Sequence, residues 1–316
     1  MRNLSFNVLE LQGGIGNLLF QYAAALKISK INNSKLLIYE SEPDTKKRLE
    51  SFLGEKLQKA SNFQSFLIGI DHNLQSIHLR IIIKILRKIK ILIGREFHGG
   101  FFSGFQKKDL PFSLVGLRLS GIYQHRDYYK SEKQFILDLI IKELFKVNKS
   151  DINILNQTTM HLRRGDYVQK GKGWPLTKKY YLDSLKLIDP KRTYPVLIIS
   201  DDPFATDSFT FYLKEKGYTV LNLPYDKDYD NLEEKVDYLR EYRGWYSMQI
   251  SNSIRDFKTI TQSKNIVMAN SSFSWWAATL GDYIYNDDSR KVVYPDGWIL
   301  GLPDILHENK WLRMSR

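Results

Sequence analysis

Short apolar runs alternate with amphipathic stretches along much of this chain. Residues 6 to 12 (FNVLELQ) predict a buried strand, the apolar-periodic stretch from Leu18 to Ile28 predicts a helix, and LLIYE, ending at Glu40, predicts a second strand. This β-loop-α-β order is how a parallel sheet begins. From there to about residue 125 the pattern is ambiguous, apart from the segment His78 to Arg95, where apolar residues recur at helical spacing opposite basic ones.

The strand-helix alternation is plainer from residue 158 onward. Predicted helices cover residues 178 to 188 and 247 to 263, and five β-rich runs predict strands: TTMHLR, PVLIIS, TVLNL, NIVMA and KVVYP. The periodicity breaks near residue 150, and the chain has neither internal repeats nor low-complexity linkers. We therefore expect two α/β units of Rossmann type, residues 1 to 150 and 151 to 316, facing each other across a cleft. The last residues are candidates to cross back to the first unit.

Composition excludes several classes of protein. Cysteine is absent, so disulfides, zinc-thiolate clusters and cysteine nucleophiles are excluded, which fits a cytoplasmic protein. The chain has neither an apolar signal segment at its start nor an apolar run of membrane-spanning length, so we expect no membrane span. The formal charge of +12 leaves three kinds of partner open: nucleic acid, an anionic membrane surface and phosphorylated ligands.

A glycine-rich motif follows the first predicted strand. Gly14, Gly16 and Asn17 lie in GGIGN, where small residues let backbone amides approach a ligand at a helix start. As a dinucleotide fingerprint the motif fails, because Leu19 stands where glycine or alanine is required. Taken alone, the motif favours a tight strand-to-helix turn.

A second motif, HLRRGDY, ends the strand that begins the second unit. Ligands of open α/β sheets bind beyond the carboxyl ends of strands, and an arginine can grip a phosphate with two parallel hydrogen bonds. Arg163 is the candidate for that contact, and alternation places His161 on its face of the strand. An ion pair between arginine and Asp166 that braces the loop is about equally expected, and a lone histidine is more often structural than catalytic.

The third motif, NSSFSWWAA, combines a strand end, hydroxyl groups and a helix start. Its candidates for phosphate binding are Asn270, Ser271, Ser272 and Ser274, because the exposed amides at a helix start and nearby hydroxyls both suit an anion. The alternative is a plain helix cap followed by two core tryptophans. Three serines among four residues exceed what capping requires.

A fourth motif, SDDP, follows the strand PVLIIS. There Asp202 could accept hydrogen bonds from ribose hydroxyls or from the N–H edge of guanine. Helix capping by Ser200, with the acidic residues in the first turn, is somewhat favoured when the motif is taken alone.

Together and in this order, GGIGNLLFQYA, HLRRGDY, SDD and NSSFSWWAA resemble the α-1,2-fucosyltransferase family, glycosyltransferase family eleven, of bacterial type. The resemblance spans residues 9 to 300. It implies a GT-B-like α/β fold, with the first unit on the acceptor side and the second binding the GDP-sugar. The implied reaction moves L-fucose from GDP-L-fucose, with inversion and without metal or other cofactor, to the 2-hydroxyl of a galactoside. The expected setting is synthesis of a surface polysaccharide such as O-antigen.

The resemblance also implies roles for particular residues. Arg163 and Arg164 match the family's donor-binding arginine pair, and His161 and Asp166 complete that element. Asp256 matches an acidic position that holds guanine in related fucosyltransferases. The sequence departs from the family pattern at Leu18, where glutamine often follows the asparagine, and at Thr279, where tryptophan is frequent. These departures point to altered packing or acceptor choice rather than to another donor class.

The chemistry of transfer requires what these motifs supply. Charge that develops on the leaving β-phosphate would be met by Arg163, the serine hydroxyls and a helix start. Asp166 is the first candidate for the general base, although it could instead orient Arg163, and the departing phosphate could replace a dedicated base. Trp174 could offer its ring face to the acceptor sugar, or it could simply be a packed surface aromatic.

Three other interpretations remain open from the sequence. A metal-dependent transferase would use an Asp-x-Asp pair, which the run 226 to 230 (DKDYD) offers, although such runs are common in solvated loops. A basic nucleic-acid-binding protein is disfavoured, because no recognisable binding module occurs. The segment 78 to 95 could contact an anionic membrane that carries a lipid-linked glycan acceptor, or pack on the first sheet; the two are about equally expected.

Overall fold

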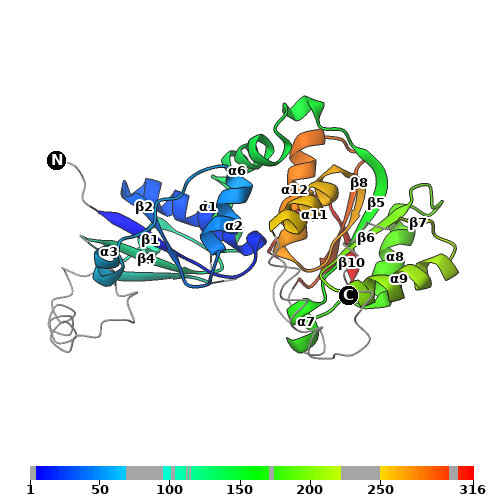
Figure 1. Ribbon diagram of the computed structural model, residues 1–316, viewed down its shortest axis with the longest axis horizontal. Helices are drawn as coiled ribbons and strands as arrows, with labels where there is room; N and C mark the ends of the chain where they lie inside the picture. The colour runs from blue at the N-terminus through cyan, green and yellow to red at the C-terminus, as the bar shows by residue number, and fades with distance from the viewer. Residues whose placement is uncertain are drawn as a thin grey trace. The chain divides into compact units, whose positions relative to one another are not determined.

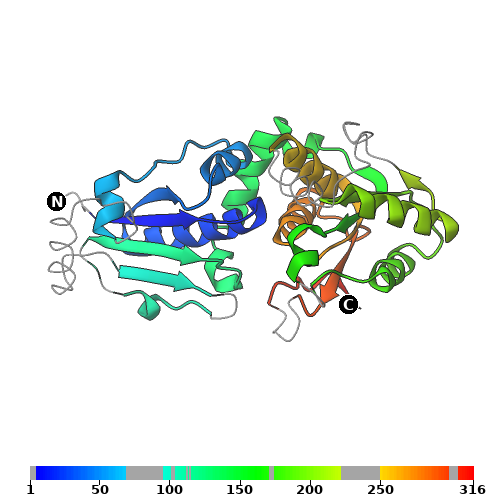
Figure 2. The ribbon, with the colours of Figure 1, turned by 60° about the horizontal axis from the view of Figure 1, so that its bottom comes forward.

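A computed structural model describes residues 5–68, 95–100, 104–111, 113, 115–170, 174–221, 250–298 and 305–316. The chain divides into two compact units, Met1–Glu143 and Leu144–Arg316, and each contains its own parallel sheet (Figures 1 and 2). The predicted class, α/β with two units built on parallel sheets, is confirmed. The division falls shortly before the predicted position near residue 150.

The first unit is built on a four-stranded sheet in the order β2-β1-β4-β3, with every neighbouring pair parallel. Its strands are β1 (Phe6–Leu11), β2 (Lys35–Glu40), β3 (Arg95–Gly99) and β4 (Gly116–Gly121). The chain turns from β1 into α1 (Ile15–Asn32), most of whose side chains are buried. Since β2 lies on one side of β1 and the β3–β4 pair on the other, the order reverses between β1 and β4.

Shorter helical segments complete this unit. They are α2 (Thr45–Leu53), α3 (Asn62–Leu67), a 3-10 turn (Lys107–Asp109), α5 (Arg126–Tyr129) and α6 (Lys133–Ile140). At the start of α3, the Ser61 hydroxyl accepts from the Gln64 amide while the Gln64 side chain accepts from the Ser61 amide, which satisfies two otherwise orphaned donors. After α6 the chain continues through a π-helical turn (Ile141–Phe145) and a 3-10 turn (Lys149–Asp151).

The second unit has a six-stranded sheet in the order β10-β9-β8-β5-β6-β7, again all parallel. Its strands are β5 (Leu155–Leu162), β6 (Val196–Ser200), β7 (Val220–Leu221), β8 (Ser263–Val267), β9 (Lys291–Asp296) and β10 (Leu312–Ser315). Numbered by appearance, this is the 3-2-1-4-5-6 order of a Rossmann sheet. The order therefore reverses between β5 and β8, which is where such sheets bind ligands.

Helices cover both faces of the second sheet. They are α7 (Gly165–Lys170), α8 (Lys178–Ile188), α9 (Pro203–Glu215), α11 (Ile250–Gln262) and α12 (Ser272–Tyr285). Side chains of α8 and α9 share one buried core with β5, β6 and β8. Helices α11 and α12 pack against each other, and Figure 1 shows them on the other face of the sheet.

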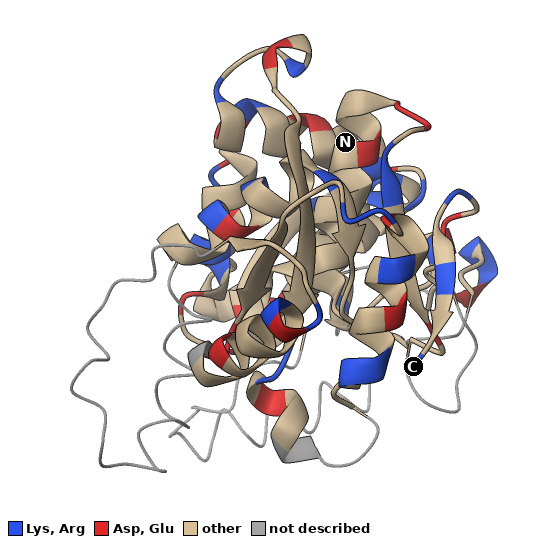
Figure 3. Cartoon of the chain, turned by 90° about the vertical axis from the view of Figure 1, so that its right-hand side faces the viewer, with Lys and Arg blue, Asp and Glu red and all other residues tan. Residues whose placement is uncertain are grey.

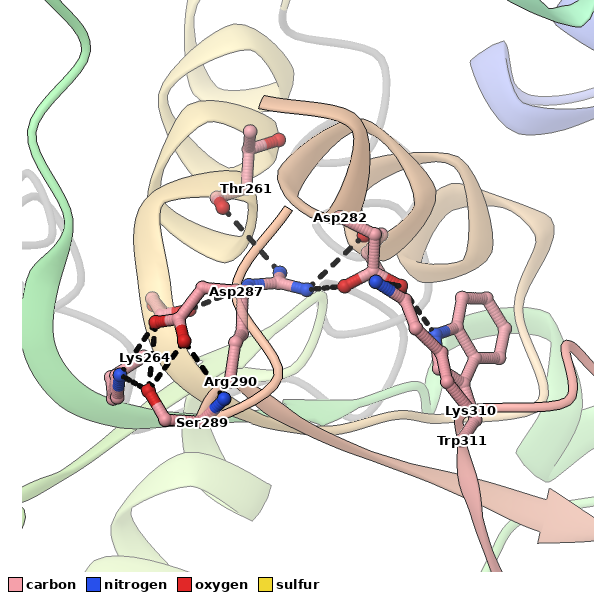
Figure 4. A network of polar contacts seen from close by, with 10 residues as sticks. Thr261, Lys264, Asp282, Asp287, Ser289, Arg290, Lys310 and Trp311 are labelled. Atoms are coloured by element: carbon pink, nitrogen blue, oxygen red, sulfur yellow. Dashed lines mark hydrogen bonds and ion pairs between the residues drawn. The ribbon is translucent and has the colours of Figure 1, made fainter. Parts of the chain in front are cut away.

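A buried ion pair fixes the C-terminal segment to α12 (Figure 4). The Arg290 guanidinium pairs with Asp282 and also donates to the backbone carbonyls of Ser263 (3.1 Å) and Ala278 (3.3 Å). The other carboxylate oxygen of Asp282 accepts from the indole N–H of Trp311 at 2.7 Å. Because Trp311 directly precedes β10, this network anchors the edge strand of the sheet.

Most of the strands and helices predicted from periodicity are present. The helix predicted over 178 to 188 is α8, and the one predicted over 247 to 263 is α11 in its described part, from Ile250. The pattern missed β3, β4 and β10. Of the predicted basic helix, residues 78 to 94 lie outside the described residues, and Arg95 begins β3.

Charge and hydropathy of the described helices give no indication of a membrane span. Within the described residues, no helix is long and apolar enough to cross a bilayer. Basic and acidic side chains are interspersed on these helices (Figure 3).

Candidate active site

The strongest cluster of predicted site residues lies at the carboxyl edge of the second sheet, beside the β5–β8 reversal. Arg163 and Arg164 directly follow β5, Asn270 lies just beyond β8, and Asp201 directly follows β6. Three motifs that are distant in sequence therefore meet because neighbouring parallel strands end at the same edge. This is the edge at which open α/β sheets bind ligands.

Arg163 is held between two carboxylates. Its guanidinium lies 2.7 Å from the Asp201 carboxylate and 2.8 Å from that of Asp166, and its side chain is 28% exposed. Burial alone would lower the pKa of Arg163, but Asp201 and then Asp166 outweigh burial and raise it above its ordinary value. The arginine is thus permanently charged, partly exposed and oriented, as binding of a phosphate group requires.

Asp201 organises the turn that carries both arginines. Besides pairing with Arg163, its carboxylate accepts the backbone N–H of Arg164 at 2.8 Å, and the residue is only 7% exposed. The sequence motif predicts the neighbouring Asp202 as the ligand-binding residue. In the structure Asp202 caps α9, accepting from the Ala205 amide at 3.2 Å, which agrees with a helix-cap interpretation of the motif.

We expect Gly165→Ala to disturb this turn specifically. A Cβ at Gly165 would lie 2.3 Å from the Asp201 carboxylate oxygen, so either the carboxylate or the start of α7 must shift. Arg163 then loses its fixed orientation; if it contacts the donor phosphate, as the sequence resemblance implies, turnover should fall by about 10²-fold, as when a group in an active site is misplaced. Steady-state kinetics beside a thermal melt tests this: unchanged turnover in the folded variant would contradict the role given to the turn.

Asn270 joins three loops at the same edge. Its backbone carbonyl accepts from the Tyr167 hydroxyl at 2.8 Å, and its side-chain amide donates to the carbonyls of Trp174 (3.1 Å) and Trp298 (3.4 Å). Arg316 donates to the same Trp174 carbonyl at 3.0 Å. Trp174 is half-buried, and its ring meets Tyr167 edge-on, which agrees with the packing interpretation; a contact with the acceptor sugar stays a prediction.

The serine motif forms the start of α12. Ser271 occupies the cap position, where no side chain caps the helix, and the first turn contains no acidic residue. Ser272 begins the helix, whereas the Ser274 hydroxyl is fully buried and donates back to the carbonyls of Ala269 and Ser271. An uncapped start of a long helix is a favourable place for an anion. Two core tryptophans, Trp275 and Trp276, follow in the buried face, as the alternative interpretation required.

His161 is the most strongly perturbed titratable group of the cluster. Burial, and secondarily the neighbouring Arg163, lower the pKa of this imidazole to about 3. Its Nδ1 has no hydrogen-bond partner, and its ring lies 5.8 Å from that of Phe273. The ring is therefore neutral at physiological pH, where it can hydrogen-bond a ligand but carries no charge.

Acid should destabilise the fold through His161. Between the unfolded pKa of about 6.5 and the folded value of about 3, only the unfolded chain binds this proton, so the free energy of unfolding falls as pH falls. At pH 5 the loss from this group is about 2 kcal/mol. Urea titrations of wild type and His161→Gln at pH 7 and pH 5 measure it; an equal loss in both proteins would contradict the assignment.

Asp256 lies on α11 and is likewise buried. Its carboxylate accepts from the Arg255 guanidinium through Nε at 3.2 Å and Nη2 at 3.1 Å. The next residue, Phe257, packs edge-on against Phe273, which in turn lies beside His161. Asp256 thus belongs to the same unit as the arginine pair, and its contact with guanine stays a prediction.

The glycine motif belongs to the other unit. Gly14 directly precedes α1, whose start has no side-chain cap, and Gly16 and Asn17 lie in its first turn. A Cβ at Gly14 would meet no atom within 4 Å, so the space above this turn is open. The Gly13 amide, with φ of 83°, donates to the Glu42 carboxylate at 2.9 Å. The tight turn predicted from the glycines is confirmed, and ligand binding there stays a prediction.

The sequence offers one candidate pair of metal ligands, in the run DKDYD (226 to 230). That run lies outside the described residues. Over the described ranges, no group of three or more histidine or acidic side chains is arranged to hold a metal ion.

Comparison with known proteins gives relatives along the whole chain. An Escherichia coli α-1,2-colitosyltransferase is 24% identical over 99% of this chain and 100% of its own length. The O-antigen biosynthesis glycosyltransferase WbnK of Escherichia coli is 24% identical over 92% of this chain and 94% of its own. No family model matches the chain.

Solved structures with similar folds include nucleotide complexes. Arabidopsis thaliana FUT1 with GDP has a TM-score of 0.47 and 12% identity over 88% of this chain and 68% of its own. The α-1,6-fucosyltransferase NodZ soaked with GDP-fucose has a TM-score of 0.42 and 11% identity over 87% of this chain and 92% of its own. Escherichia coli heptosyltransferase WaaC with ADP has a TM-score of 0.44 and 7% identity over 98% of this chain and 92% of its own.

Proposed function

We propose that this chain, which is similar to a colitosyltransferase and an O-antigen glycosyltransferase along nearly its whole length, transfers L-fucose from GDP-L-fucose to the 2-hydroxyl of a galactoside. One observation carries the proposal: two groups suited to anions, the fixed Arg163 guanidinium and the uncapped start of α12, both occur at the reversal point of a Rossmann-ordered sheet. A sugar diphosphate presents two anionic groups, which suit these two features.

The reaction follows from these groups. Cleaving the bond between sugar and phosphate builds negative charge on the leaving β-phosphate, which fixed donors must stabilise. The Arg163 guanidinium is already oriented by Asp201 and Asp166, so little reorganisation is needed when that charge develops. The amides at the start of α12 supply a second set of donors. We propose that these groups act without a metal.

The attacking hydroxyl must also lose a proton. Asp166 is the exposed carboxylate of the cluster, with its side chain 45% exposed, whereas the Asp201 side chain is buried. An accessible carboxylate beside the phosphate-binding arginine is suitably placed to receive this proton. Its ion pair with Arg163 equally supports the role of orienting the arginine.

Asp166→Asn separates these two roles. A general base contributes about 10²- to 10⁴-fold, so its loss should lower kcat by that range while GDP affinity changes little. If Asp166 only orients Arg163, GDP affinity should weaken together with kcat. Turnover and calorimetric GDP affinity are measured on the same preparation, and near-normal kcat would exclude Asp166 as the base.

A second donor is supported by one specific observation. The relative that matches 99% of this chain is a colitosyltransferase. Colitose is L-fucose without its 3-hydroxyl, so the two donors differ in one ring substituent. A site that hydrogen-bonds this hydroxyl rejects the deoxy sugar strongly, whereas a site without that contact accepts both.

Direct competition between the two donors tests the proposal. We expect kcat/KM with GDP-L-fucose to exceed that with GDP-colitose, and transfer to persist in excess EDTA. Preference for GDP-colitose would show that colitose, not L-fucose, is the sugar transferred. Activity that is lost in EDTA but restored by manganese would overturn the metal-free mechanism. An acceptor array of galactose-containing glycans, including lipid-linked ones, identifies the acceptor.

Binding to a membrane and binding to nucleic acid can each be tested directly. Contact with an anionic membrane was predicted from a segment outside the described residues, and liposome flotation tests it: absence from both anionic and neutral vesicles would reject it. Nucleic acid is the least expected partner. Salt-sensitive binding of RNA or DNA, unaffected by GDP, would contradict that expectation.

A further inference from the structure

A buried glutamine contacts the glycine motif of the first unit. The Gln124 side-chain amide donates to Asn17 Oδ1 at 3.1 Å, from a position 107 residues away in sequence. Gln124 is only 4% exposed, and its Oε1 has no hydrogen-bond partner. Burying a half-satisfied amide costs stability that an apolar side chain of the same size would not. Packing alone therefore does not account for a glutamine here.

The turn that presents Gln124 is itself strained. Tyr123, directly before it, has φ of 56°, an uncommon conformation for a bulky residue. Its fully buried ring occupies the space where Gly99 would carry a Cβ, and its hydroxyl donates to the Phe97 carbonyl at 3.0 Å. Such backbone strain persists only where surrounding contacts enforce it, and it is concentrated at functional sites.

The contact determines which way the Asn17 amide points. An asparagine amide can rotate by half a turn, exchanging its donor nitrogen and acceptor oxygen. Because Gln124 donates, the Asn17 oxygen faces Gln124, and the nitrogen lies on the side of the glycine turn, 3.1 Å from where a Cβ on Gly13 would be. That turn lies at the reversal point between β1 and β4 of the first sheet, at its carboxyl edge.

We propose that Gln124 is a positioning residue that fixes Asn17 so that its Nδ2 donates to an oxygen of a transfer substrate. The inference rests on the proposed function and adds a residue of the first unit to it. The oxygen is either a phosphate oxygen of the donor or a hydroxyl of the acceptor sugar. The two alternatives predict different kinetics. When the Asn17 contact is lost, the KM should rise strongly only for the substrate that Asn17 binds.

Two substitutions should have matching effects. Gln124→Glu replaces the donor by a carboxylate, so the Asn17 amide turns and presents its oxygen to the site. Asn17→Asp keeps the bond from Gln124 but places an oxygen where the nitrogen was. Each should lower kcat/KM by about 10- to 100-fold, the range for losing one hydrogen bond to a substrate. A rise in KM for GDP-L-fucose identifies the phosphate; a rise in KM for the acceptor identifies the sugar hydroxyl.

Two control variants distinguish a positioning role of Gln124 from a purely structural one. Asn7 is a buried amide at the opposite end of β1, bonded to Ser29 and the Leu117 amide, so Asn7→Leu should lower stability but leave kcat/KM unchanged. Gln124→Met removes the bond without introducing charge, and it should give a smaller loss than Gln124→Glu. Wild-type kcat/KM in both Gln124 variants, or an equal loss in Asn7→Leu, would overturn the proposal.

Failure of the proposed function is recognised separately. If wild-type protein transfers no fucose, that function fails, and Gln124 is then tested by calorimetry with GDP-L-fucose, GDP-colitose and GDP. Weaker binding by Gln124→Glu and Asn17→Asp than by Asn7→Leu supports the positioning role. Equal nucleotide affinities for all three variants exclude the donor phosphate, and equal affinities for a galactose-terminated glycan as well overturn the positioning role.

Discussion

Arg163→Ala should abolish transfer, lowering kcat/KM by about 10³-fold or more, and should remove most of the GDP affinity. The guanidinium is the charged donor held at the reversal point of the second sheet, within 2.8 Å of two carboxylates. Under the proposed mechanism, the leaving phosphate would then lose the oriented positive charge that stabilises it. The measurement is steady-state kinetics with GDP-L-fucose, together with GDP titration calorimetry.

Two further variants make this result specific to Arg163. Arg163→Lys keeps a positive charge and an ion pair for buried Asp201 but loses the forked geometry, so we expect folded protein with severely reduced turnover. Arg192→Ala removes an arginine from the opposite edge of the same sheet, where it lies over the Tyr218 ring, and should leave turnover unchanged. Unaltered GDP affinity in both Arg163 variants would refute the phosphate contact.

Asp282→Ala should have the largest effect on stability, lowering the free energy of unfolding by about 3–5 kcal/mol. The substitution leaves the Arg290 guanidinium, whose side chain is 1% exposed, without its carboxylate, and it removes the acceptor of the Trp311 indole. Urea denaturation measures the loss. Asp287→Ala is the matched control from the same network: its pair with Lys264 is partly exposed and should contribute about 1 kcal/mol or less (Figure 4).

Replacing both partners of the buried pair gives a second check. Asp282→Leu combined with Arg290→Met should recover much of the stability lost by Asp282→Ala, because no uncompensated charge stays buried. A loss for Asp282→Ala no larger than that for Asp287→Ala would show that the buried pair does not anchor the C-terminal strand.

Periodicity predicted the buried strands of the second sheet because their side chains are apolar on both faces. All five residues of β6, Val196–Ser200, are buried, as expected for a central parallel strand. The two missed edge strands lack this signal: β3 (REFHG) and β10 (LRMS) are short and largely exposed, and each contains charged side chains. Hydrogen bonds to a neighbouring strand, rather than burial of their side chains, define them as strands.

Site residues could be predicted where a motif marks the end of a strand, but not where packing selects between neighbours. The sequence places Asp201 and Asp202 equally well after β6, and only the fold shows that the first reaches Arg163 while the second caps a helix. Gln124 gave no local signal, because its significance lies in a contact with Asn17, 107 residues away.

Product analysis tests the central claim most directly. Purified protein is incubated with GDP-L-fucose and a galactose-terminated glycan in excess EDTA, and the product linkage is determined by NMR. The account predicts a new α-linked fucose on the 2-hydroxyl of galactose, formed by wild type and Arg192→Ala but not by Arg163→Ala. A fucosylated product formed equally by Arg163→Ala, or a linkage to another hydroxyl, would contradict it.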